Sequence, residues 1–199
     1  MSETPVCLAS ASEVRARLLR DAGVEFDIIP ANIDETVIKD AYPNGDGHGS
    51  LATLLAEQKA LHVSKQRPHA LVLGADQTLN CDGRSFDKPT SMEAARETLL
   101  LLRGRRHTLT AAVCVVRGDQ VLWRHQAQAV LEMREFSDPF LERYLARAGD
   151  MVLSSVGAYR LEDIGAQLFS AVEGDYFTVL GLPLVPVLDF LRSEGVLVT

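Results

Sequence analysis

The sequence predicts an α/β protein built on a mixed central sheet that is flanked by helices. Short apolar runs of strand type alternate with segments in which apolar residues recur at helical spacing, and this alternation is typical of α/β proteins. Two pairs of strands are joined by short turns, which requires antiparallel pairing within the same sheet. The 199 residues, 47% of them hydrophobic, suffice for one domain (1–199) with a buried core, in which two lobes could share one sheet.

The first part of the chain predicts strands and helices in turn. The expected strands cover residues 6–9, 24–30 and 71–79, and the expected helices cover residues 13–22 and 50–65. Gly23 ends the first of these helices, and Ser50 can cap the second. The segment from Tyr42 to Gly49 is turn-rich. Gly74, within the most apolar strand, allows another backbone or a ligand to approach closely.

The remaining part of the chain predicts two hairpins and further helices. The expected strands cover residues 84–86, 107–116 and 121–133, and the expected helices cover residues 91–102, 138–148 and 183–192, with a short helical turn at 161–169. Thr90 and Glu93 have the spacing of a capping box, and Pro139 stands at the first helical position. Asn80–Gly83 and Glu173–Asp175 read as turns.

Composition narrows the range of functions. A net charge of −7 argues against a broad nucleic-acid surface, which needs clustered Lys and Arg. No apolar run approaches the roughly 20 residues that span a bilayer, and Met1–Pro5 does not begin a signal peptide, so we expect a cytoplasmic protein without a membrane partner. Cys7, Cys81 and Cys114 form no CxxC pair and are expected to be reduced packing residues.

Two candidate sites lie in the first 35 residues. Ser10–Ser12 with Arg15 could bind an anion, because a strand-to-helix junction offers free N–H groups and Arg adds a fork of donors. The alternative is that these serines only cap the helix. Glu35 follows an expected strand and is either a functional acid or an ordinary loop acid.

Two further candidates lie around the third expected strand. Asp76 ends an apolar strand, where a carboxylate either serves chemistry or caps nearby N–H groups. Lys88 is held by Pro89 and is either aimed at a ligand or an exposed loop lysine. Together, two carboxylates could hold a hard divalent cation and activate water while Arg and Lys neutralise phosphate oxygens, which predicts phosphoryl-type transfer. The sequence contains no GxxxxGK[ST] phosphate-binding loop.

Several motifs resemble those of one known family. In order, they are LASASEVRARLLRDAG, IDE, EQKA, LGADQT, DKP, GAYRLEDIGAQLF and EGDYFTVLGLPL. They are similar to the Maf family of nucleoside triphosphate pyrophosphatases, and the similarity runs from Leu8 to Leu184. The resemblance implies an elongated, two-lobed Maf/ITPase-like fold with a cleft between the lobes and a homodimer in many members. It also implies hydrolysis of nucleoside triphosphates to monophosphate and diphosphate with Mg²⁺ or Mn²⁺.

The resemblance also assigns roles to residues. It implies that Asp76 accepts a proton and that Glu35 and Lys88 are cleft residues. We add the hypothesis that Glu35 and Asp76 hold the metal directly or through water, and that Lys88 contributes to catalysis by stabilising charge on the leaving group. Further cleft residues implied for substrate binding are Ser10, Arg15, Lys59, Gln77 and Glu162. The chain departs from the family's usual Ser-Pro-Arg-Arg start, because Glu13 and Val14 replace Pro and the first Arg. Arg15 is then the remaining member of that pair, with Arg17 as a further cation on the same helix.

The motifs give mixed indications of the preferred base. Gln77 and Glu162 are similar to the branch that acts on 7-methyl-GTP, since a Glu can pair with the positive charge of a methylated guanine. The tripeptide 157–159 (GAY) is similar to the other branch.

The hypothesis from the sequence is therefore a pyrophosphatase that removes modified nucleotides from the nucleotide pool, a house-cleaning role. One alternative is a protein that senses nucleotides without turnover, which would have little use for a base at Asp76. Another is a phosphatase that releases orthophosphate.

Overall fold

The chain folds into two compact units connected by long strands. The structure, a computed structural model, describes residues 4–42 and 50–198. Unit 1 comprises Met1–Asp76, Thr110–Ala127 and Gly181–Thr199, and unit 2 comprises Gln77–Leu109 and Gln128–Leu180. The turn-rich segment predicted at Tyr42–Gly49 lies, apart from Tyr42, outside the described residues.

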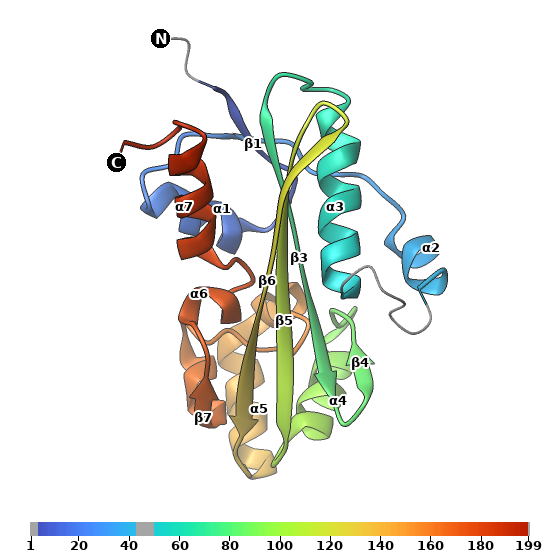
Figure 1. Cartoon of the computed structure of the whole chain (residues 1–199). Coiled ribbons are helices and arrows are strands. Elements are labelled where there is room, and N and C mark those ends of the chain that lie inside the picture. The colour runs from blue at the N-terminus through green and yellow to red at the C-terminus, as the bar shows by residue number, and fades with distance from the viewer. Residues whose placement is uncertain (1–3, 43–49, 199) are drawn as a thin grey trace. The chain divides into compact units, whose positions relative to one another are not determined.

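A mixed sheet forms the centre of the fold (Figure 1). Its strands are β1 (Val6–Leu8), β2 (Asp27–Ile28), β3 (Leu71–Cys81), β4 (Arg84–Phe86), β5 (Arg106–Arg117), β6 (Gln120–Met133) and β7 (Phe169–Glu173). The strand order is β2-β1-β3-β5-β6-β7, with β4 paired to β3. β1 pairs in parallel with β2 and β3, whereas the β3–β4 and β6–β7 pairs are antiparallel. The predicted α/β class with a mixed sheet is therefore confirmed.

Helices cover the sheet within each unit. They are α1 (Glu13–Asp21), α2 (Glu35–Asp40), α3 (Leu51–Ser64), α4 (Met92–Leu102), α5 (Asp138–Ala148), α6 (Tyr176–Val179) and α7 (Leu184–Ser193), with 3₁₀ helices at Gly149–Ser154 and Ile164–Leu168. The five long helices predicted from apolar spacing are all present. Within the described parts of the chain, no helix is long and apolar enough to span a bilayer.

In unit 1, α3 covers one face of the sheet and α7 covers the other, as Figure 1 shows. Side chains of neighbouring β6 residues point to opposite faces of the sheet, so their contacts show which helix lies on which face. Arg124 Nε donates to Glu57 of α3 at 2.7 Å, whereas the Trp123 ring stacks on Phe190 of α7 at 5.1 Å between ring centroids. The layer under α3 is made of small residues, among them Ala52, Ala56, Ala60, Cys7, Val72 and Cys114.

Gly74 allows α3 to lie directly on β3. A Cβ added at Gly74 would lie 2.0 Å from the main-chain oxygen of Ala56 and 2.7 Å from the main-chain nitrogen of Ala60. Any side chain here would clash with helix backbone, which cannot rotate away. The prediction that another backbone approaches at Gly74 is therefore confirmed, and the approaching backbone is that of α3.

In unit 2, α4 and α5 pack against the apolar face of the strands. That core encloses a polar cluster in which His107 Nε2 lies 2.8 Å from the Tyr159 hydroxyl, and His107 is only 2% exposed. Burial lowers the pKa of His107 to about 4, so the imidazole is neutral at pH 7. The Tyr144 hydroxyl donates to the main-chain oxygen of Ala158 at 3.1 Å. This neutral cluster anchors the segment at 158–159.

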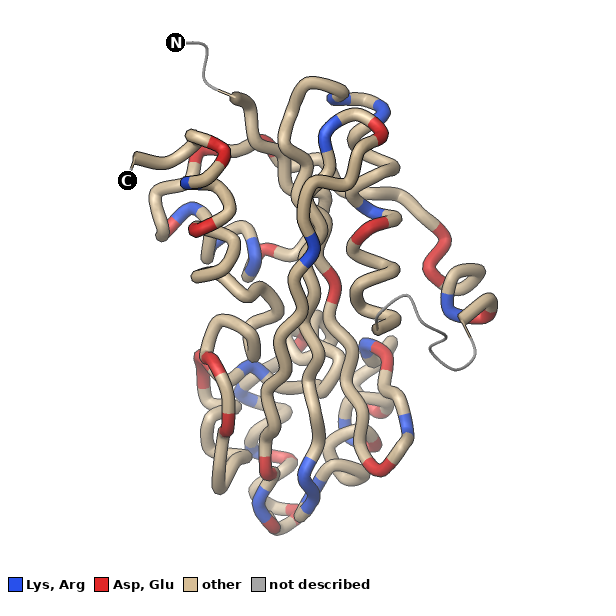
Figure 2. The backbone as a smooth tube through the Cα atoms, in the orientation of Figure 1, with Lys and Arg blue, Asp and Glu red and all other residues tan. Residues whose placement is uncertain are grey.

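Charged side chains gather on helices and turns and leave long uncharged stretches in the strands (Figure 2). Asp76 differs from other charges within strands, such as Arg124, because it is buried. The three cysteines are buried and free, which confirms that they are packing residues. Burial raises the pKa of Cys114 to about 12, so its thiol stays protonated.

Several elements differ from the predictions. β2 contains two residues because pairing with β1 covers only Asp27 and Ile28. The α4 cap is Ser91, whose Oγ accepts from Ala94 N at 3.1 Å, so the predicted capping box at Thr90 is wrong by one residue. Similarly, Ser137 caps α5 and places Pro139 at the second helical position, not the first. The short elements α2, α6 and β7 were not predicted.

Candidate functional site

The ammonium group of Lys59 joins two carboxylates in unit 1. Lys59 Nζ lies 2.5 Å from Asp76 Oδ1 and 2.7 Å from Glu35 Oε1. The side chains of Lys59 and Asp76 are only 12% and 11% exposed, whereas that of Glu35 is 40% exposed. Removing charged groups from water costs free energy even when they are paired, so a largely buried cluster of three charges is a candidate functional site.

Three elements bring these side chains together. Asp76 is the last residue that β3 contributes to unit 1. Lys59 precedes Ala60 on α3, and the contact of α3 with Gly74 keeps this part of the helix against β3. Glu35 is the first residue of α2, which Asp34 caps by accepting from Thr36 N at 3.0 Å. The three sequence-predicted residues Glu35, Lys59 and Asp76 are thus assembled in one place.

Arg15 lies close to the same carboxylates but points its donors at the backbone. Its Nε donates to Gly181 O at 2.8 Å, and its Nη1 donates to Ala75 O at 2.8 Å. Burial lowers the pKa of Arg15, and the negative charges of Asp76 and Glu35 act in the opposite direction. Arg15 therefore joins α1 to the middle of β3 and to the segment that leads into α7. Its predicted contact with substrate stays a prediction.

The serines of the first junction have local partners. Ser12 caps α1 by accepting from Arg15 N at 3.4 Å, so for Ser12 the capping interpretation is confirmed. Ser10 is buried, and its Oγ accepts from Ser12 N and from Arg15 Nη1, each at 3.2 Å. Ser10 thus helps to fix Arg15, while Arg17 is exposed on α1.

The donor atoms of Glu35 and Asp76 suit a hard divalent cation. Both carboxylates already converge on a single cation, the Lys59 ammonium group. Mg²⁺ in phosphoryl-transfer enzymes is usually held by one or two carboxylates together with substrate phosphates. Among the residues that the structure describes, no group of three or more His, Cys, Asp or Glu side chains could hold a metal. To hold such a cation, Glu35 and Asp76 would need further oxygen ligands from substrate phosphates or water, and the metal stays a prediction.

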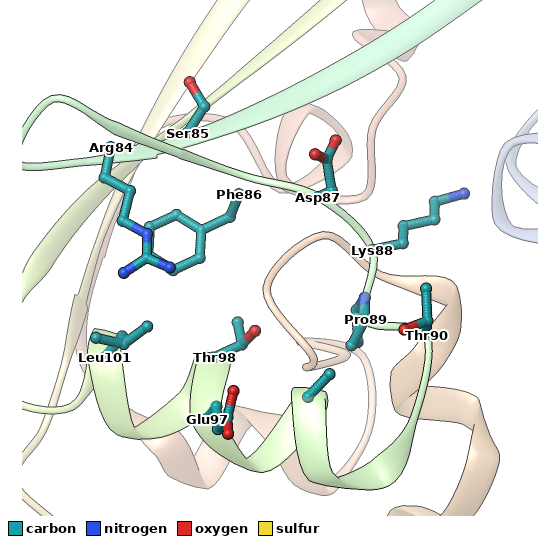
Figure 3. Close-up of a pocket in the computed structure, with 11 residues that line it drawn as sticks. Arg84, Ser85, Phe86, Asp87, Lys88, Pro89, Thr90, Glu97, Thr98 and Leu101 are labelled. Carbon is teal, nitrogen blue, oxygen red and sulfur yellow. The ribbon is translucent and has the colours of Figure 1, made fainter. Parts of the chain in front are cut away.

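Lys88 belongs to unit 2 and lines a pocket of about 300 Å³ there (Figure 3). Figure 3 shows Arg84 and Phe86 facing Thr98 and Leu101 of α4, while Lys88 extends away from that helix. The Arg84 guanidinium lies 5.1 Å from the centre of the Phe86 ring. This pocket contains neither of the acids predicted to act in catalysis, and the predicted catalytic role of Lys88 stays a prediction.

Gln77 has a structural task in unit 2. Its Nε2 donates to the main-chain oxygens of Thr178 and Val179, both at 3.0 Å. The amide nitrogen is thereby fully used in tying β3 to the end of α6. Its predicted contact with the base stays a prediction.

Glu162 is paired with a neighbour that the sequence reasoning did not consider. Arg160 Nε and Nη2 donate to Glu162 Oε1 at 3.1 and 3.0 Å, and the two side chains are 19% and 11% exposed. The Glu162 charge is therefore already balanced within the chain. The sequence does contain a signal for this pairing, because Arg160 stands two positions before Glu162. It contains no signal for the main-chain carbonyls that accept from Arg15, because every residue has a main-chain carbonyl.

Comparison with known proteins shows the family of this chain. A nucleoside triphosphate pyrophosphatase of Paramagnetospirillum magneticum is 50% identical over 192 residues, which are 96% of this chain and 99% of that protein. A 7-methyl-GTP pyrophosphatase of Brucella abortus is 46% identical over 188 residues, covering 94% of each chain. The structure of a HAM1 protein from Coxiella burnetii matches 65% of this chain and 73% of that chain with a TM-score of 0.43 and 19% identity. The family described as Maf-like protein matches residues 5–194, and the chain belongs to that family.

Proposed function

We propose that this protein is a nucleoside triphosphate pyrophosphatase, which hydrolyses a nucleoside triphosphate to the monophosphate and diphosphate. The observation that carries the proposal is the Lys59 ammonium group held between Glu35 and Asp76. The 50% identity to a protein named for this activity, over almost the whole of both chains, supports the same reaction.

The reaction needs a base, and Asp76 is the proposed one. Lys59 engages Asp76 Oδ1, and Oδ2 would take a proton from water. The water oxygen would then bond to the α-phosphorus while the bond from that phosphorus to the oxygen bridging to the β-phosphorus breaks. Diphosphate leaves with the electron pair. Because β3 is an internal strand, the base is carried on a rigid element.

Positive side chains would balance the negative charge of the triphosphate. Lys59 can place its ammonium group on phosphate oxygens, and the Arg15 charge lies near enough to both acids to influence them. Glu35 and Asp76 would hold a divalent cation, Mg²⁺ or Mn²⁺, which would neutralise further phosphate charge when bound.

7-Methyl-GTP is a second candidate substrate, because the Brucella abortus relative named for it is 46% identical. The pairing of Glu162 with Arg160 weighs against a strong preference, since a methylated guanine would compete with an existing Arg for the same carboxylate. We therefore propose that unmodified triphosphates are also accepted. A house-cleaning role in the cytoplasm and a homodimer belong to the same proposal.

A product analysis tests the function. The purified protein is incubated with Mg²⁺ and a panel of unmodified and 7-methylated nucleoside triphosphates, and the products are separated by ion-exchange chromatography. We expect monophosphate and diphosphate in equal amounts. Release of a nucleoside diphosphate together with orthophosphate would show that the protein is a phosphatase instead. Tight binding without product would make it a nucleotide sensor.

A further inference from the structure

We propose that Lys59 competes with the divalent cation for the position between Glu35 and Asp76, so that metal binds well only when a triphosphate draws Lys59 away. This inference rests on the proposed function, because it concerns how that reaction's metal is admitted. It assigns Lys59 a second role, coupling metal binding to nucleotide binding, in addition to neutralising phosphate.

The Lys59 ammonium group already occupies the position between one oxygen of each acid. The Lys59 nitrogen makes contact with Asp76 Oδ1 at 2.5 Å and with Glu35 Oε1 at 2.7 Å. A Mg²⁺ ion binds oxygens at about 2.0–2.1 Å, so it would need the space that the ammonium group fills. Lys59 and a metal bridging both oxygens therefore exclude each other.

The charge balance points in the same direction. Glu35 and Asp76 supply two negative charges, Lys59 contacts both, and the charge of Arg15 lies close enough to influence the same two acids. The cluster is therefore close to neutral, and a neutral cluster attracts a divalent cation weakly. Removing the Lys59 charge would leave an excess of negative charge at the two acids.

Of the two cations, Lys59 is the one able to move. Arg15 is fixed by donation to the main-chain oxygens of Gly181 and Ala75. Lys59 ends in an ammonium group on a flexible four-carbon stem, and it contacts the side chains of Glu35 and Asp76. A triphosphate offers it several negatively charged oxygens in exchange. Metal and nucleotide would then each raise the affinity of the other, as thermodynamic linkage requires.

The first test measures Mn²⁺ binding without nucleotide, by the loss of the electron paramagnetic resonance signal of free Mn²⁺. We expect Lys59→Met to bind Mn²⁺ at least about tenfold more tightly than the wild type, since one positive charge has gone from contact distance. Lys65→Met is the matched control, because Lys65 is an exposed residue just after the same helix. Equal or weaker binding by Lys59→Met overturns the proposal.

Lys59→Arg separates charge from shape and also serves if the Met variant fails to fold. Arg keeps the positive charge, so its Mn²⁺ affinity should stay within about threefold of the wild-type value, well short of the tenfold gain. If Lys59→Arg also bound Mn²⁺ about tenfold more tightly than the wild type, competition between charges would not be the cause.

The second test measures coupling. Mn²⁺ affinity is determined with and without a triphosphate analogue that carries a methylene bridge between the α- and β-phosphorus atoms and cannot be hydrolysed there. The analogue should raise Mn²⁺ affinity several-fold more in the wild type than in Lys59→Met. Comparing the two proteins cancels the binding of Mn²⁺ to the analogue in solution. An equal gain in both proteins contradicts the proposal.

Failure of the proposed function would look different. Both binding measurements proceed without turnover, so they stand if the panel yields no product. If the wild type hydrolyses the triphosphate panel but Lys59→Met binds Mn²⁺ no more tightly than the wild type, the proposed function is supported and the competition by Lys59 is overturned.

Discussion

The two units bury polar side chains in different ways. Unit 1 holds a cluster of formal charges, in which Lys59 lies between Asp76 and Glu35. Unit 2 holds a neutral pair, in which His107 contacts the Tyr159 hydroxyl inside an apolar core. A hydrogen-bonded neutral group costs less to bury than a charge, even a paired one, although His107 Nδ1 has no hydrogen-bond partner among the described residues. The difference fits the proposal that the charged cluster serves chemistry, whereas the neutral pair belongs to the core of unit 2.

The largest expected effect comes from Asp76→Asn, which removes the proposed base from the charged cluster. Asn has the same shape and can still accept from Lys59, so the fold and part of the nucleotide binding should remain. Turnover should fall by at least about 100-fold, as is typical when a general base is lost. Steady-state rates of diphosphate release measure this, with circular dichroism to verify folding. Asp119→Asn, in the exposed β5–β6 turn, is the matched control, and full activity of Asp76→Asn would remove Asp76 from this role.

Gly74→Ala tests how the charged cluster is assembled. The new methyl group would lie 2.0 Å from the main-chain oxygen of Ala56, so α3 must move away from β3 and carry Lys59 with it. We expect unfolding free energy to fall by about 3 kcal/mol, the upper part of the range for overpacking, and turnover to fall as well. Urea denaturation measures the stability.

Gly83→Ala is the control for that variant. Gly83 has a positive φ of 82° and open space around it, so its change should cost about 1 kcal/mol from backbone strain alone. Equal losses in the two variants would show that the close contact at Gly74 is not the cause.

The buried His107 of unit 2 should make the free energy of unfolding depend on pH. The folded-state pKa of His107 is about 4, below the ordinary value of 6.5, so as pH falls the unfolded chain takes up a proton first. Stability is therefore lost between about pH 6.5 and pH 4, and between pH 7 and pH 5 the loss is about 2 kcal/mol. His107→Gln should remove this part of the pH dependence in urea denaturation. The exposed His69→Gln should retain it, and an unchanged slope in His107→Gln would refute the assignment.

The smallest effect is expected at Gln77, the residue directly after Asp76. Gln77→Ala loses two hydrogen bonds to the main-chain oxygens of Thr178 and Val179, which should cost about 1–2 kcal/mol of stability. Gln120→Ala, at an exposed position, should change stability little. A changed preference among nucleotides with unchanged stability would instead favour the base-selecting role that the family resemblance implies.

The sequence predicts well what depends on local pattern. Apolar spacing located the five long helices, and the turn at Asn80–Gly83 was correct because Asp82 and Gly83 adopt the positive φ angles that such turns need. Asp76 stood out because a charge follows the apolar run at 71–75, but the prediction that the strand ends there is wrong, since β3 continues to Cys81. The short helix α2 was missed although Asp34 followed by Glu35 is a common helix start, since six residues show too little periodicity.

Contacts between distant segments were not predictable from one sequence. Nothing local indicates that Lys59 would meet Glu35, or that Arg15 would give its donors to Gly181 and Ala75. Those contacts depend on how α3 and α1 pack on the strands. Residue patterns indicated Glu35 and Asp76, the family resemblance added Lys59, and the structure supplied their contacts.

The close contact at Gly74 sets an asymmetric limit on change. Glycine is the smallest residue, so every replacement at this position adds atoms where the Ala56 and Ala60 backbone leaves no space. On α3 itself, Ala52, Ala56 and Ala60 already carry only methyl groups, so all changes there except to glycine enlarge the layer too. A redesign of this site must therefore alter helix and strand together. Almost no single substitution in this layer near Lys59 would be tolerated.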